Sequence, residues 1–196
     1  MNWLNELHLE YNSREDLVNI FGVILYTDAN PYVKKVLSDE NFWKALDIIS
    51  GLKWVIFSIK PKKGYYSYPE SSHVMMSFMS MHPTYREPKE NEAILKEFNI
   101  SSTKDIPLLL CFTQDKDGEI LKSTLKIEDD FVDSAYNSLR KNIKVVTDAV
   151  DGILDENRKN SLGVYGAVNA AIDSHKFWER VKKGIIFYEW IKKFKP

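Results

Sequence analysis

Residue types that commonly carry out chemistry are sparse in this sequence. Its one cysteine, Cys111, lies in the apolar run over residues 108–112. A thiolate in such surroundings is poorly solvated, so we expect Cys111 to have a raised pKa and to be an unreactive core residue. The four histidines lack the spacing of a metal-binding motif. The sequence therefore predicts no metal site, no cofactor and no catalytic residue.

A short polar stretch is the best candidate for a ligand-binding site. Thr27, Asp28 and Asn30 lie between an apolar run and a predicted helix that begins at Pro31. The first amide groups of a helix can bind an anion or another polar ligand. Asn30 is also typical of a helix N-cap, so two interpretations stay open: a small-ligand site and ordinary capping. Two neighbouring acids, Asp129 and Asp130, precede another predicted helix and are assigned to its capping.

Aromatic and basic residues gather toward the end of the sequence. Residues 176–196 carry seven basic and two acidic side chains, a net charge of +5. This composition is typical of a surface that contacts a protein partner, a second copy of the chain or an anionic membrane. The alternative is that these side chains pack back onto the body of the protein. The candidate residues of an interaction surface are Tyr66, Trp178, Phe187 and Trp190.

Apolar runs and turn signals define the predicted strands. The runs lie over residues 21–26, 54–59, 106–113 and 120–127. A helical pattern separates the first two, which predicts a right-handed unit with parallel strands. The turn Asp115-Lys116-Asp117-Gly118 separates the last two, which predicts an antiparallel hairpin.

Helical periodicity accounts for most of the remaining chain. The predicted helices cover residues 31–50, with a division near 38–40, and residues 90–98, 131–150, 162–172 and 175–194. Two regions follow from this pattern. The first is an α/β domain over residues 1–150 with an irregular insertion at 61–90. The second is a helical extension over residues 151–196 that packs on or near the domain.

The order of these elements resembles the thioredoxin-like fold over residues 18–150. The closest local match is Phe98-Asn99-Ile100, a loop, and Ile106-Pro107 opening an apolar strand. The resemblance implies a mixed four-stranded sheet flanked by helices. It also implies a cis peptide bond before Pro107, and it would place that proline beside the polar stretch that begins at Thr27. Thioredoxins carry two cysteines at that corner; residues 27–31 contain none, which excludes dithiol oxidoreductase chemistry.

Composition narrows the classes of function. The 196 residues include 27 basic and 28 acidic side chains, so a net charge of −1 gives no overall attraction to nucleic acid. No signal-peptide pattern or long apolar run is visible, and we expect a soluble, cytoplasmic protein. The leading hypothesis is a non-catalytic binding or adaptor protein that contacts another protein. The alternatives are a small-ligand protein or enzyme that uses the 27–31 corner with Pro107, and a homo-oligomer assembled through the C-terminal helix.

Overall fold

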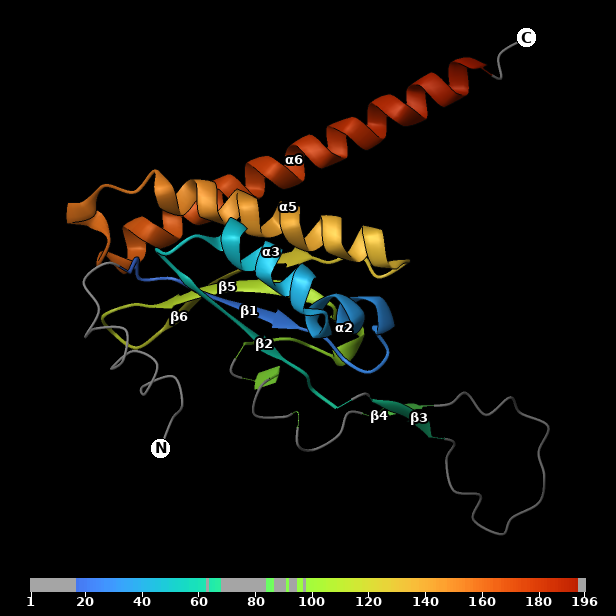
Figure 1. Cartoon of the computed structure of the whole chain (residues 1–196), viewed down its shortest axis with the longest axis horizontal. Coiled ribbons are helices and arrows are strands. Elements are labelled where there is room, and N and C mark those ends of the chain that lie inside the picture. The colour runs from blue at the N-terminus through green and yellow to red at the C-terminus, as the bar shows by residue number, and fades with distance from the viewer. Residues whose placement is uncertain are drawn as a thin grey trace.

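The computed structural model describes residues 17–62, 64–67, 84–86, 91, 95–96 and 98–193 (Figure 1). Its strands are β1 (Phe21–Leu25), β2 (Val55–Ile59), β3 (Tyr65–Ser67), β4 (Thr84–Arg86), β5 (Leu108–Gln114) and β6 (Ile120–Lys126). Its helices are α2 (Pro31–Ser38), α3 (Glu40–Ser50), α5 (Val132–Asp151) and α6 (Ser161–Lys193). Short 3₁₀ helices span Thr103–Asp105 and Asp155–Asn157.

The main sheet has four strands in the order β2-β1-β5-β6. β1 is parallel to β2 and antiparallel to β5, and β5 is antiparallel to β6. The predicted mixed α/β sheet, with its parallel unit and its hairpin, is therefore confirmed. All five residues of β1 are buried, as expected for an inner strand covered on both faces. A separate two-stranded ladder, β3-β4, lies in the predicted insertion over residues 61–90.

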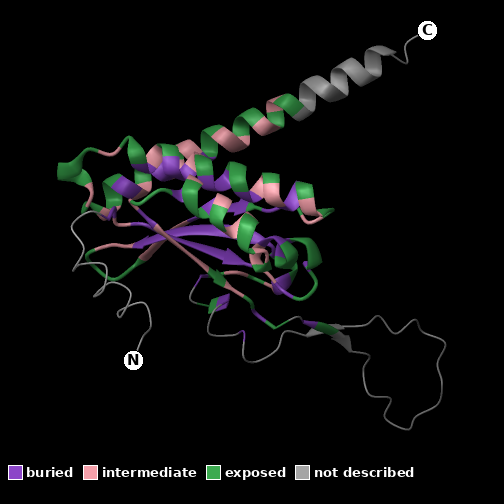
Figure 2. Ribbon diagram, viewed as in Figure 1, coloured by how far each residue is buried: buried purple, intermediate pink, exposed green. Residues whose placement is uncertain are grey.

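Two apolar clusters cover the two faces of the main sheet. On one face, buried residues from β1, β5 and β6 pack against α2, α3, α5 and the first part of α6. Figures 1 and 2 show these helices lying together over the sheet, with buried residues between the layers. On the other face, Phe21, Val23, Leu110 and Phe112 form a second cluster with Phe98. The helices seen over the first face position the candidate surfaces described below.

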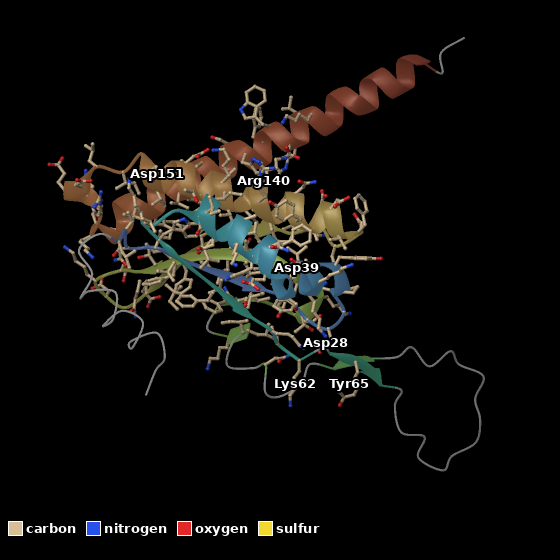
Figure 3. All side chains as sticks on the ribbon, in the orientation of Figure 1. Asp28, Asp39, Lys62, Tyr65, Arg140 and Asp151 are labelled. Atoms are coloured by element: carbon tan, nitrogen blue, oxygen red, sulfur yellow. The ribbon has the colours of Figure 1, made fainter. Side chains whose placement is uncertain are left out.

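The predicted division of the helix over residues 31–50 is also confirmed, and Asp39 causes it. Asp39 has extended backbone dihedral angles, φ −90° and ψ 120°, between α2 and α3 (Figure 3). Its carboxylate accepts hydrogen bonds from the amides of Asn41, at 2.9 Å, and Phe42, at 3.3 Å. These contacts satisfy first-turn amides of α3, which is the usual role of an aspartate N-cap. Gly51 ends α3 with a positive φ of 70°, which glycine adopts without strain.

The prediction of two separate helices over 162–172 and 175–194 is wrong. The structure has one helix, α6, of 33 residues. Between the two predicted segments lie Asp173 and Ser174, and neither residue interrupts the helical hydrogen bonds as proline would. Asp173 instead accepts a hydrogen bond from the Asn169 side chain, at 3.1 Å, one turn earlier. α6 therefore continues without a break from the core into the part that extends beyond α5 (Figure 1).

Candidate functional site

The four residues of the predicted ligand corner lie at one end of the main sheet. Thr27, Asp28 and Asn30 are in the turn between β1 and α2, and Pro107 directly precedes β5. Because Leu25 pairs with Leu108 in the antiparallel ladder, the turn and Pro107 lie at the same end. The peptide bond between Ile106 and Pro107 is cis, as predicted.

Thr27 and Asn30 are buried and bond mainly to each other. Asn30 Oδ1 accepts hydrogen bonds from the Thr27 amide, at 2.8 Å, and from the Thr27 hydroxyl, at 3.2 Å. The backbone carbonyl of Asn30 accepts from the Lys34 amide at 3.0 Å. Asn30 thus occupies the N-cap position of α2, but its side chain makes no capping hydrogen bond. The prediction that Asn30 is the N-cap residue of α2 is confirmed, but the prediction that its side chain caps the helix is wrong.

Asp129 takes over the capping contact of α2. The Val33 amide donates to Asp129 Oδ1 at 2.7 Å, although the two residues are 96 positions apart. The assignment of Asp129 to the start of the next helix is therefore wrong. In that helix, α5, Ser134 makes the N-terminal contacts: its Oγ accepts from the Phe131 amide at 3.1 Å. A carboxylate at the start of α2 also suits the helix dipole, and it occupies an amide that an anionic ligand would need.

Replacing Asp129 with alanine is expected to lower the free energy of unfolding by about 1 kcal/mol, the usual cost of losing a capping side chain. Urea denaturation would measure the change. The control is Asp130→Ala, because Asp130 is exposed and adjacent. We expect this control to change stability by less than about 0.5 kcal/mol. Equal losses in the two variants would contradict the capping role.

Asp28 is the exposed member of the corner, and it lies close to two lysines. Its carboxylate is 2.8 Å from Lys60 Nζ and 3.1 Å from Lys34 Nζ. The hydrogen bonds from Lys60 and then Lys34 lower the pKa of Asp28. Asp28 is therefore a carboxylate at neutral pH and can accept hydrogen bonds there, but it is poorly suited to act as a proton donor.

Cys111 is buried in the sheet, as predicted. Its side chain is 1% exposed, and burial raises the pKa of the thiol to about 12. Since the thiolate is the reactive form, this cysteine is inert in the folded protein.

Of the four residues predicted to form an interaction surface, the structure describes the side chain of Trp178. Trp178 and its neighbour Phe177 are each 60% exposed, and their ring centroids lie 5.8 Å apart in an edge-on contact. Nearby, an ion pair of 2.5 Å joins Glu179 to Lys141 of α5. The backbone of α6 continues to Lys193. The side chains of Tyr66, Phe187 and Trp190 lie outside the described part of the structure.

Among the described residues, no three His, Cys, Asp or Glu side chains are placed to hold a metal ion. In the same part of the chain, no helix combines the length and the apolar character that crossing a membrane requires. Comparison with known proteins assigns the chain to no family, since no family model, curated protein or solved structure matches it.

Proposed function

We propose that this chain is a non-catalytic binding protein that contacts a partner protein through the C-terminal part of α6, residues 177–193. The observation that carries the proposal is the exposure of Phe177 and Trp178 at the start of this segment. Large aromatic side chains are enriched at protein interfaces, where they supply much of the binding energy. Here they are adjacent and both lie on a helix that extends beyond α5 (Figure 1).

The position of the two rings on α6 supports the same proposal. The first part of α6 is held by burial of Val164, Val168 and Ile172 in the core. This packing anchors the helix, and contact with a partner would cover the two exposed rings of Phe177 and Trp178. The later residues Phe187 and Trp190, which the sequence places on the same segment, would extend this contact surface.

The scaffold of the proposal is thioredoxin-like. The sequence resemblance implies a mixed four-stranded sheet, and the order β2-β1-β5-β6, with β1 and β2 parallel and the other neighbours antiparallel, supports this scaffold. The burial of Cys111 supports a role without thiol chemistry. On this scaffold we assign the binding role to the helix that follows the sheet.

Photo-crosslinking tests the proposal directly. Benzoylphenylalanine is placed at Trp178 in the full chain, and in a control at Leu154, which is 64% exposed and lies before α6. We expect an adduct of one discrete mass from position 178, absent from position 154 and lost when Phe177→Glu is added. Mass spectrometry then identifies the partner or a second copy of the chain. No adduct at position 178 above the level of the Leu154 control would overturn the proposal.

A further inference from the structure

A polar groove follows the outer edge of β6, between that strand and the nearby helices α5 and α6. We call it the β6 groove. One part is a cavity of about 430 Å³ between β6, α5 and α6. The other part, about 420 Å³, lies between β6, α6 and the loop over residues 99–105. Lys176 lines both cavities, and every residue from Lys122 to Lys126 lines one or the other. The groove is therefore elongated along the strand.

The first cavity of the groove has an excess of positive charge. Four cations line it, Lys126, Lys141, Lys176 and Arg180, against two carboxylates, Glu128 and Glu179. Four minus two gives a net charge of +2.

One of the four cations is already neutralised, because Lys141 pairs with Glu179 at 2.5 Å. Among the residues that the structure describes, Lys126, Lys176 and Arg180 make no ion pair. His175 also lines this cavity, and burial and then Lys141 lower its pKa, so its ring is neutral at pH 7 and offers an N–H donor.

The backbone edge of β6 also offers donors. The Ile127 amide donates to the Pro107 carbonyl at 3.1 Å, and the Asp115 amide donates to the Glu119 carbonyl at 3.0 Å. These bonds fix the alternation of the β5-β6 ladder, so the even-numbered residues of β6 turn their amides and carbonyls away from β5.

Side chains from the two helices cover two of these outward carbonyls. Tyr165 Oη of α6 donates to the Lys122 carbonyl at 3.0 Å. Asn142 Nδ2 of α5 donates to the Lys126 carbonyl at 2.9 Å. Within the described part of the chain, the amides of Lys122, Thr124 and Lys126 have no acceptor. An edge with two covered carbonyls and three open amides disfavours full pairing with another strand and favours a ligand rich in acceptors.

We propose that the β6 groove binds an extended acidic peptide segment, with its carboxylates directed to Lys176 and Arg180. The inference rests on the proposed binding function and gives the partner a chemical character. The length of the groove along β6 favours a peptide, because five strand residues span about 17 Å. Complementary charge then sets specificity and accelerates association, and high salt weakens it.

A hexaglutamate peptide is the probe, and the full chain is the protein. We expect saturable binding by fluorescence anisotropy at low salt, with a shift of the Thr124 amide resonance in NMR spectra. The charge-reversed variant Lys176→Glu/Arg180→Glu should bind about tenfold more weakly. The matched control is Lys35→Glu, an exposed lysine of α2 without an ion pair in the described structure, which should bind hexaglutamate as the wild type does.

Three outcomes would overturn the inference: no saturable binding of hexaglutamate, equal weakening by the Lys35→Glu control, or a Thr124 shift caused by pyrophosphate and not by hexaglutamate. The last outcome would indicate a small phosphate ligand. If hexaglutamate does not bind but the crosslinked adduct forms from position 178, only the proposal for the β6 groove is rejected. Hexaglutamate binding without a Trp178 adduct would reject the α6 docking surface alone.

Discussion

Replacing Phe112 with alanine is expected to lower the free energy of unfolding by about 3 to 5 kcal/mol, the usual cost of removing a buried aromatic ring. Phe112 is fully buried on β5, an inner strand of the sheet. Its ring centroid lies 5.5 Å from that of Phe21 and 5.2 Å from that of Phe98. The substitution would therefore remove the centre of the second apolar cluster and leave a cavity between two rings.

Urea denaturation followed by circular dichroism measures this loss. The matched control is Phe131→Ala, since Phe131 is 57% exposed and uses its backbone at the start of α5. We expect the control to cost about 0.5 kcal/mol. Similar losses in the two variants would show that the face of the sheet opposite α5 is not a close-packed core.

The core of the fold was predictable because the sequence patterns that specify its strands and helices each lie within a short stretch of the chain. The apolar run of β1, the helical pattern after Pro31 and the Asp-Gly turn before β6 each fix one element, and chain order then limits how they pair. Asp39 divides α2 from α3 by bonding to residues two and three positions away. A short contact of this kind is visible in the sequence.

The candidate site was less predictable because its contacts join distant residues. Asp129 caps a helix whose capped residue, Val33, is 96 positions earlier, and the sequence offered a nearer helix instead. The cations of the β6 groove come from a strand and from two helices, and only Lys176 and Arg180 belong to the basic stretch over residues 176–196 that the sequence shows. Only the packing of α6 against α5 and β6 brings them to one groove.

α6 differs from the other helices because its composition changes along its length. Small residues such as Gly163 and Gly166 lie near its start and aromatic residues toward its end. This change in composition predicts two separate helices. Continuity depends instead on the absence of any break at Asp173 and Ser174. That continuity decides the functional interpretation, because it carries Trp178 away from the core on the same helix that buries Val168.

Replacing Gly22 with alanine is expected to lower the free energy of unfolding by about 1 to 3 kcal/mol, the range for overpacking a core. This prediction runs against the general preference, since alanine is favoured over glycine inside a strand by about 0.5 to 1 kcal/mol. The reason is the close approach of Trp54. A Cβ atom at position 22 would lie 2.7 Å from Cζ3 of Trp54 and 3.2 Å from Cγ1 of Ile56.

Trp54 cannot easily move away from that contact. Its side chain is 3% exposed, and its indole nitrogen donates to Thr147 Oγ1 of α5 at 3.1 Å. The Thr147 hydroxyl is itself within 3.4 Å of the Ser50 carbonyl at the end of α3. Gly22 therefore allows the ring to lie against β1 while its polar end reaches α5.

A double-mutant cycle measures the coupling between the two positions. In the background of Trp54→Phe, which has a smaller ring, Gly22→Ala should cost less by about 1 kcal/mol, because contacting residues couple by roughly 0.5 to 3 kcal/mol. The control is Gly166→Ala in α6, where no atom lies within 4 Å of the added Cβ. There alanine should stabilise the helix by about 0.5 to 1 kcal/mol. Additive costs at Gly22 and Trp54, or a stabilising Gly22→Ala, would show that the sheet and Trp54 are not packed as closely as the structure places them.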